Sequence, residues 1–471
     1  MHFRKQVLGC CVLTALACVV GGCRPNEAAS SSPDAASEAS AAPPTEEVPT
    51  PSACELALAP RPGTGRLDLE ISRLQAKLRT EPNAFRYLEN LGWLFVAKAR
   101  ESFDPGYYKL AEQCALCLDA HQPQSPEALL LRGHVLQNLH RFKEAETLAS
   151  ELVARRGLSF DYGLLGDALM EQGNLDEAAE AYQKMVDEKP DLQAYARIAH
   201  LRWLKGDLPG ANAIMRLAAG AASPNSPEVA AWVHTRLALL QFQDGDLAGA
   251  NTTCGVALDY QREYPPALLV RGRLLLAEGD AGAAAAALQR AVQLNPLPDY
   301  QWVLSEALRA AKRDEEAAAV EQTLRQQGAA TDPRTLALYL ASRGESPATA
   351  LELAQAELNT RGDVFTHDAL AWALAANGQI AQARSEMQWA LSQGTRDARL
   401  FLHAGVIAAK AGEKEEAQAW LDKAAGMMPL LLPSEQTLWQ KLAGEIGATE
   451  LGSAQAAPGI EPLSSMMNQR R

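Results

Sequence analysis

The chain has 471 residues, enough for several domains of ordinary size or for one long repeat array. Its apolar share of 47% is dominated by Ala and Leu, with 6% aromatic residues, which favours closely packed helices over a β-sheet core. The formal net charge of −13 argues against nucleic acid as a main partner, because phosphate binding needs clustered Lys and Arg.

The first 22 residues have the pattern of a signal peptide. Arg4 and Lys5 precede a 14-residue apolar stretch, Val7 to Val20, which is too short to span a bilayer as a helix. The Val-Gly-Gly-Cys sequence that ends at Cys23 resembles the lipobox of bacterial lipoproteins. The resemblance implies a lipid such as palmitate on Cys23 and a place at the bacterial cell envelope, in the outer membrane facing the periplasm if two membranes are present. An ordinary secretory signal that contains cysteines is the alternative.

Residues 23–62 form a low-complexity segment rich in Ala, Ser, Pro and Glu, with no aromatic residue. Such a composition cannot bury enough apolar surface to offset the entropy of the chain. We therefore expect a disordered tether between the lipid on Cys23 and the folded part.

The rest of the chain repeats, and the plainest unit runs from Tyr162 to Pro190. It resembles the consensus of the tetratricopeptide repeat (TPR). Gly166 in the first helix and Ala178 in the second are small, so two antiparallel helices can approach closely. Gly173 relieves the backbone where the first helix ends.

The small residue of the first helix recurs with steps of 33, 33, 39, 34, 33, 32, 34 and 34 residues from Gly133 onward. The recurring positions are Gly92, Gly133, Gly166, Ala199, Ala238, Gly272, Ser305, Ala337, Ala371 and Gly405. The resemblance implies an all-α fold, a right-handed superhelical solenoid of about ten TPR-like helix-turn-helix repeats. We place the solenoid at 63–446, with capping helices at 66–78 and 434–446, and expect a C-terminal tail at 447–471.

Two places break the period of the repeats. About seven extra residues surround 103–106, and the 39-residue step contains 221–227. Insertions in solenoids bulge from one face and often serve binding, although many are merely tolerated length.

The cysteines give a weak signal for chemistry. Four of them follow Cys23, at Cys54, Cys114, Cys117 and Cys254, too few for a disulfide scaffold. Cys114, Cys117 and His121 share one helix face, which would suit a metal or redox site. However, buried cysteines also serve as small hydrophobic residues, and no fourth ligand lies nearby. We predict no metal and no cofactor, and leave open whether Cys114 and Cys117 pair.

The concave surface of the array is the candidate binding groove. In TPR proteins the first helices line this surface, and aromatic residues and Arg most often anchor partners. The repeat frame selects Trp203, Trp232, Trp302, Phe242, Arg273, Arg309 and His200 as groove residues. The alternative is that these tryptophans fill the packing between neighbouring repeats.

Catalytic motifs are missing from the sequence, including HExxH, the G-x-S-x-G elbow, the P-loop and GxGxxG. We therefore expect a membrane-tethered scaffold that binds another protein or peptide and is not an enzyme. Neither nucleic acid nor a small-molecule substrate is inferred. The alternatives are an accessory subunit of an envelope enzyme or assembly machine, and a structural repeat protein that associates with itself.

Overall fold

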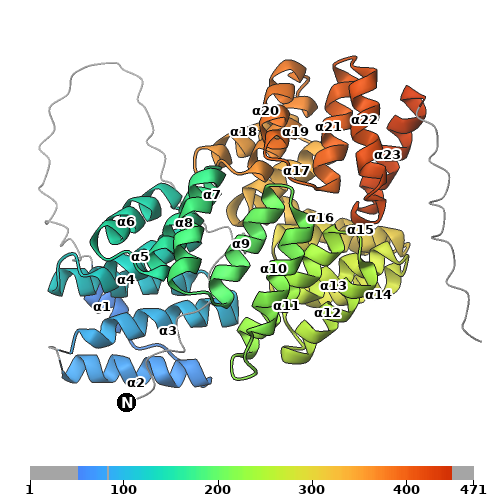
Figure 1. Cartoon of the computed structure of the whole chain (residues 1–471). Coiled ribbons are helices and arrows are strands. Elements are labelled where there is room, and N and C mark those ends of the chain that lie inside the picture. Colours follow the sequence, from blue (N-terminus) through green and yellow to red (C-terminus); the bar gives the residue numbers. More distant parts are fainter. Residues whose placement is uncertain (1–50, 82–83, 448–471) are drawn as a thin grey trace, which may run out of the picture.

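The computed structural model describes residues 51–81 and 84–447, and over these residues it contains 23 α-helices, one short 3-10 helix and no strand (Figure 1). The helices are α1 (Ala53–Leu58), α2 (Arg66–Thr80), α3 (Arg86–Ser102), α4 (Gly106–His121), α5 (Pro126–Asn138), α6 (Phe142–Arg155), α7 (Ser159–Glu171), α8 (Leu175–Glu188), α9 (Leu192–Leu204), α10 (Leu208–Gly220), α11 (Pro227–Gln243), α12 (Leu247–Tyr260), α13 (Pro265–Ala277), α14 (Ala281–Leu294), α15 (Pro298–Ala310), α16 (Asp314–Thr331), α17 (Pro333–Arg343), α18 (Pro347–Leu358), α19 (Val364–Ala376), α20 (Ile380–Ser392), α21 (Ala398–Lys410), α22 (Lys414–Ala425), η1 (Met428–Leu430) and α23 (Pro433–Ile446). The predicted signal peptide, Cys23, most of the predicted tether and nearly all of the predicted tail lie outside the described residues.

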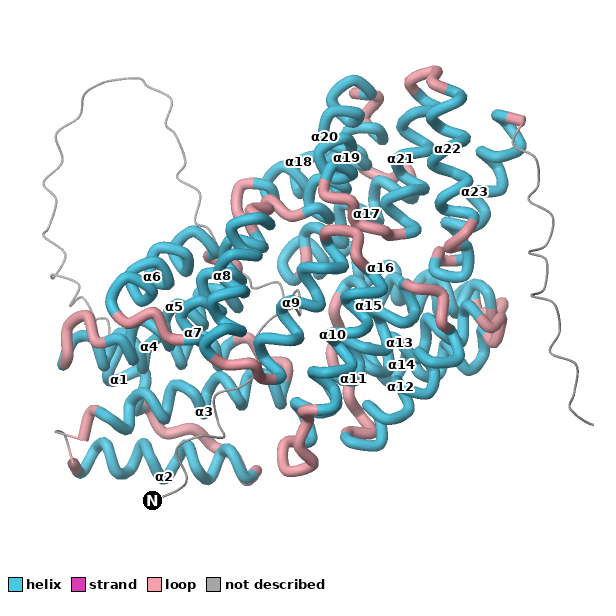
Figure 2. The backbone as a smooth tube through the Cα atoms, viewed as in Figure 1, coloured by secondary structure: helices cyan, strands magenta, loops and turns pink. Residues whose placement is uncertain are grey.

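The helices from α3 to α22 form ten antiparallel pairs, so the predicted all-α solenoid of TPR-like repeats is confirmed (Figure 2). In each pair we call the odd-numbered helix the first helix and the even-numbered one the second helix. The predicted capping helices correspond to α2 and α23. They cover the two ends of the array, which would otherwise leave apolar helix faces in water.

Local sequence explains where the helices of a pair begin and end. Gly245 and Gly279 have φ values of 81° and 83°, which only glycine adopts at no steric cost, and they end the turns after α11 and α13. In both turns the next residue is an aspartate that caps the second helix. Asp246 accepts a hydrogen bond from the Gly249 amide, and Asp280 accepts one from the Ala283 amide.

The small residues of the first helices lie where helices make their closest contacts. A Cβ atom added to Gly166 would lie 2.4 Å from the ring of Tyr182, and one added to Gly272 would lie 2.3 Å from Leu288. Both partners belong to the second helix of the same pair. The packing reason for the 34-residue period is therefore confirmed at these two positions.

A short helix, α1, lies inside the range for which the sequence predicts a disordered tether. A disulfide joins Cys54 in α1 to Cys117 in α4. The amide of Gln75 also donates hydrogen bonds of 3.0 and 2.9 Å to the carbonyl oxygens of Ala57 and Ala59. Covalent and polar contacts thus order a segment whose composition alone could not, and the described fold begins before residue 63.

The superhelix closes on itself between its N-terminal and C-terminal halves, as Figure 1 shows for α7 and α9 beside the C-terminal helices. The hydroxyl of Thr395 donates a hydrogen bond to the Leu204 carbonyl, 191 residues away. A Cβ atom added to Gly206 would lie 2.4 Å from the carbonyl oxygen of Gly394. Turn glycines therefore permit backbone to approach backbone where the two halves meet.

The two insertions in the repeat also meet. The first lengthens α3 to 17 residues, and the second contributes the turn before α11, which also has 17 residues. Arg100 of α3 forms an ion pair with Glu228 of α11. The Phe103 ring, just after α3, lies 6.3 Å from the ring of Tyr264. The extra residues thus serve contact between repeats that are distant in sequence.

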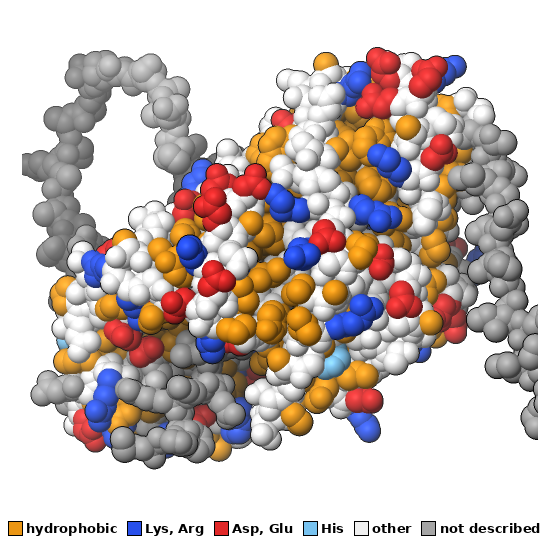
Figure 3. Space-filling view, viewed as in Figure 1, with side chains coloured by type: hydrophobic (Ala, Val, Ile, Leu, Met, Phe, Trp, Pro, Cys, Tyr) orange, Lys and Arg blue, Asp and Glu red, His pale blue; other side chains and the backbone are white. Residues whose placement is uncertain are grey.

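The outer surface mixes side chains of all kinds, as the face in Figure 3 shows. Among the described residues the large hydrophobic side chains that stay exposed are Leu69, Leu158 and Leu217. No helix between residues 51 and 447, as far as these are described, is both long and apolar enough to cross a bilayer.

Candidate functional site: a charged central cavity

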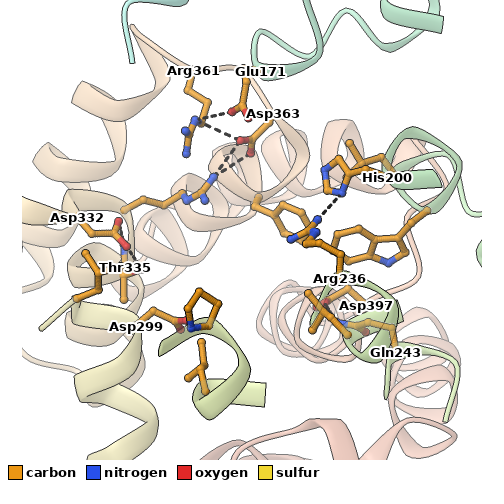
Figure 4. Close-up of a pocket in the computed structure, with 18 of the residues that line it drawn as sticks. Glu171, His200, Arg236, Gln243, Asp299, Asp332, Thr335, Arg361, Asp363 and Asp397 are labelled. Carbon is orange, nitrogen blue, oxygen red and sulfur yellow. Dashed lines mark hydrogen bonds and ion pairs between the residues drawn. The ribbon is translucent and has the colours of Figure 1, made fainter. Parts of the chain in front are cut away.

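The superhelix surrounds a partly open cavity of about 400 Å³, which we call the central cavity (Figure 4). Most of its lining comes from nine first helices, α5 to α21, and the rest comes from turns, α6 and η1. The predicted concave surface of first helices therefore lines this cavity. Apolar side chains such as Leu269 and Leu338 share the lining with an unusual number of charged ones.

One side of the central cavity is an ion-pair network that closes the ring. Arg361 lies 2.9 Å from Glu171 of α7 and 3.6 Å from Asp363, and Arg334 of α17 lies 3.0 Å from Asp363. Burial alone would raise the pKa of Asp363, but Arg334 and Arg361 outweigh it and hold that pKa below its ordinary value. Burial raises the pKa of Glu171 despite its contact with Arg361.

A second buried group fixes the lining at α7. Asp167 accepts hydrogen bonds of 2.8 Å from the guanidinium of Arg197 and from the hydroxyl of Tyr182. Burial raises the pKa of Asp167, and the Arg197 charge opposes that shift. Because both charges lie inside the protein, removing either would leave the other buried without its partner.

Two more carboxylates of the lining act as helix caps. Asp332 accepts hydrogen bonds from the amide and hydroxyl of Thr335 at the start of α17. Asp397 accepts hydrogen bonds from two amides at the start of α21 and one of 3.3 Å from the side-chain amide of Gln243. These carboxylates are thus occupied by the fold itself.

Arg236 of α11 is a cavity cation without a carboxylate partner in the described part of the chain. Its guanidinium lies 2.8 Å from Nδ1 of His200 on α9. Burial lowers the pKa of His200 well below its ordinary value, and the Arg236 charge adds to this shift, so the imidazole stays neutral and accepts the hydrogen bond. Burial lowers the pKa of Arg236 to about 10, which still leaves it protonated at neutral pH.

Asp299, in the first turn of α15, is a cavity anion without a cationic partner in contact among the described residues. No hydrogen bond or ion pair within residues 51–447, where described, reaches its carboxylate, although the side chain lines the central cavity. Burial raises its pKa, and the more distant charges of Arg273 and Arg399 oppose the shift. Figure 4 shows Asp299 across the cavity from Arg236 and His200.

The predicted groove residues divide into two sets. His200, Trp203, Trp232 and Arg273 line the central cavity. Trp203 is buried between Phe365, at 5.5 Å between ring centroids, and the Arg396 carbonyl. Trp232 and Arg273 are half-buried and keep surface toward the cavity.

The other three predicted groove residues lie away from the lining. Trp302 and Phe242 are each 1% exposed, and Trp302 packs under the guanidinium of Arg399. Arg309 forms an ion pair of 2.8 Å with Glu321 of α16. Trp302 and Phe242 therefore belong to the core. For Trp302 this agrees with the alternative that the tryptophans fill the packing between neighbouring repeats.

Sequence reasoning missed Arg236, Asp299, Arg334 and Asp363 as site residues. Asp299 and Arg334 each follow a proline that starts a first helix, a position where a polar residue usually faces water. Arg236 is the only Lys, Arg, Asp or Glu of α11 beyond its first turn. This single charge in a largely apolar first helix could have identified Arg236, because such a charge must face either solvent or an interior partner.

The two cysteines of α4 have different roles. Cys117 pairs with Cys54, and Cys114 is buried and free. Sulfur atoms of Cys54 and Cys117 and a ring nitrogen of His121 lie within 4.8 Å of one another, close enough to share a metal ion. Zinc binds thiolates, however, and a disulfide offers none. Burial raises the pKa of the Cys114 thiol, which makes it an inert core residue.

Comparisons with known proteins agree with the repeat frame. The family model described as tetratricopeptide repeat matches residues 130–193, 164–227, 269–333 and 369–429, a little under half of the chain. No curated protein matches the sequence.

Several solved structures match this chain, including the following three. A tetratricopeptide repeat protein from Parabacteroides merdae has 16% identity and a TM-score of 0.41, covering 51% of this chain and 92% of its own. Yeast Tom70 has 13% identity and a TM-score of 0.33, covering 81% and 92%. The MamA protein has 16% identity and a TM-score of 0.29, covering 36% and 91%.

Proposed function

Because the matched segments are tetratricopeptide repeats, we propose that this chain is a membrane-tethered scaffold that binds another protein at the bacterial cell envelope. The observation that carries the proposal is the stack of ten helix pairs between two capping helices. Stacked helix pairs present large, rigid surfaces, and this is the usual basis of protein binding by repeat proteins.

Two features support a place outside the cytoplasm. The sequence that ends at Cys23 resembles a lipobox, and the first 22 residues have the pattern of a signal peptide. The disulfide between Cys54 and Cys117 belongs to the oxidising compartments in which such bonds persist. The lipobox-like sequence and the disulfide thus support the same compartment from independent residues.

The membrane half of the proposal is tested by metabolic labelling with radioactive palmitate and cell fractionation. We expect label in the wild-type chain, no label in Cys23→Ala, and release of that variant from the membrane. Cys18→Ala, within the apolar stretch, is the matched control and keeps the label. Equal labelling of wild type and Cys23→Ala would refute the lipid on Cys23.

The binding half is tested by chemical cross-linking of the full chain in membranes. Trp232 is the predicted anchor for substitution, since it is an aromatic groove residue that keeps exposed surface. Trp232→Ala should reduce the yield of the cross-linked partner several-fold. Trp420→Ala is the control, because Trp420 is also half-buried but belongs to the second helix α22. A yield that is the same in both variants and the wild type would reject the groove, and cross-links solely to a second copy would favour self-association.

A further inference from the structure

The central cavity contains polar groups that the fold leaves without a partner of opposite kind. Arg236 has no carboxylate partner and Asp299 has neither hydrogen bond nor ion pair in the part of the chain that the structure describes. Gln243, only 8% exposed, has an amide oxygen with no hydrogen-bond donor, and Nε of Arg273 has no acceptor. All four side chains line the same space.

Buried polar groups without a partner are rare in folded proteins because each one costs stability. Gln243 is buried, and Arg236, Asp299 and Arg273 are half-buried and face the cavity. The other carboxylates discussed above have partners within the fold, so these groups stand out. Glu171, Asp363 and Asp167 have arginine partners, and the two capping aspartates are held by amide groups. What remains is the carboxylate of Asp299 and two arginines that have no carboxylate partner among the described residues. Arg236 lies across the cavity from Asp299 (Figure 4), and Arg273 donates a hydrogen bond to the Leu430 carbonyl.

We propose that the central cavity binds a small dipolar molecule that carries a carboxylate and an ammonium group, either a free amino acid or a short peptide with an apolar side chain. The ligand carboxylate accepts hydrogen bonds from the guanidinium of Arg236, and the ligand ammonium pairs with the carboxylate of Asp299. The amide oxygen of Gln243 is a further acceptor for a ligand N–H group.

The size and the remaining lining of the cavity fit this class of ligand. A volume of about 400 Å³ lies within the range of small-molecule sites, roughly 300–1,000 Å³. Leu239, Leu269 and Val270 come from the same two helices as Arg236 and Arg273, and they supply an apolar wall for a side chain. Such a mixture of apolar walls and a few fixed polar groups is typical of ligand pockets.

The inference goes beyond the proposed scaffold function and does not depend on the lipid. Trp232, the anchor in the partner-binding test, also lines the central cavity, whereas the ligand is held by Arg236 and Asp299. Arg236→Gln and Asp299→Asn leave Trp232 in place, so loss of the ligand can be told apart from loss of the cross-linked partner.

The test is isothermal titration calorimetry of the detergent-solubilised full chain with leucine and with the dipeptide leucyl-leucine. Binding of either one to the wild type is expected, and comparison of the two tells a free amino acid from a peptide as the better ligand. Arg236→Gln and Asp299→Asn should each weaken binding by about 10-fold or more, because each removes one charged partner. Arg313→Gln is the matched control, since Arg313 pairs with Glu316 on the outer surface.

Blocked dipeptides assign the two ends of the ligand. N-acetyl-leucyl-leucine should bind the wild type about 10-fold more weakly than the free dipeptide, and Asp299→Asn should then weaken it no further. Leucyl-leucine amide should show the same relationship with Arg236→Gln. Thermal melting checks the fold: both variants should melt close to or above the wild-type temperature, because each removes a half-buried charge that has no oppositely charged partner.

Three outcomes would overturn the proposal. These are no measurable binding of either compound at about 10 mM, affinities that neither substitution changes in well-folded variants, and blocked dipeptides that bind as tightly as the free one.

Discussion

The backbone amide of Gly362 donates a hydrogen bond of 3.1 Å to the carbonyl oxygen of Glu171, although the two residues are 191 positions apart. The neighbouring Arg361 lies 2.9 Å from the Glu171 carboxylate. A backbone bond and an ion pair therefore join α7 to the turn before α19. This junction converts the concave surface of a repeat array into the wall of a cavity.

Arg361→Met tests how much this junction contributes to stability. Arg361 is 5% exposed, so the substitution leaves Glu171 buried without its arginine and should lower the free energy of unfolding by about 3–5 kcal/mol. Urea unfolding measures the change. Arg384→Met is the control, because its pairs with Glu413 and Glu416 lie at the surface and are worth at most about 1 kcal/mol. Equal losses in the two variants would mean that the junction adds little.

Gly166→Ala tests the close packing within a repeat. The added methyl group would lie 2.4 Å from the Tyr182 ring, so a core side chain must move, at about 1–3 kcal/mol. Gly255→Ala in helix α12 meets no atom within 4 Å and should stabilise by roughly 0.5–1 kcal/mol. Thermal melts of the two variants compare them directly. A stabilising Gly166→Ala would contradict the packing account.

The paired substitution of Cys54 and Cys117 by Ser tests the disulfide. A cross-link between residues 63 positions apart should contribute about 4 kcal/mol through the entropy of the unfolded chain. Reductant should therefore lower the melting temperature of the wild type and leave that of the double variant unchanged. If reductant lowers both melting temperatures equally, the Cys54–Cys117 bond is not what stabilises the fold.

Buried histidines predict a loss of stability as the pH falls. Burial lowers the pKa of His134 to about 3, so the imidazole is neutral in the folded protein but titrates near 6.5 in the unfolded chain. Its contribution is fully present above pH 6.5 and is lost as the pH falls toward the folded pKa, at about 1.4 kcal/mol per unit.

The matching experiment compares the wild type with His134→Gln in urea at about pH 7.5 and pH 5.5. The wild type should lose more stability than the variant between these values, by about 1–1.5 kcal/mol. Taking the difference removes the contributions of buried carboxylates, which both proteins share. Parallel losses would show that His134 does not titrate in the way its burial requires.

The local parts of this structure could be predicted from the sequence. Gly133, Gly166 and Gly272 identify the first helices, because only a small residue fits where neighbouring helices approach. The closure could not be predicted in the same way. The contact of Gly362 with Glu171 depends on small rotations added over several repeats, and no single repeat specifies that sum.

The candidate site was predicted only in part for the same reason. Trp203 and His200 were identified as residues of the inner surface, and they do line the cavity. Arg236 and Asp299 were not identified. Their lack of an oppositely charged partner becomes visible only when helices α9 to α15 are placed around one cavity. The pairing of Cys54 with Cys117 likewise depends on α1 lying against α4, which low-complexity sequence gives no reason to expect.

The central proposal is that this chain holds a partner protein at the membrane through a lipid on Cys23. The most direct measurement is cross-linking in intact membranes, with mass spectrometry to identify the partner and to measure how much of it is linked to helices α3 to α22. The account predicts the same heterologous partner in repeated preparations from the wild type and its loss from membranes when Cys23 is replaced by Ala. Recovery of cross-links within single chains alone, or an unchanged yield of membrane-bound complex for Cys23→Ala, would contradict it.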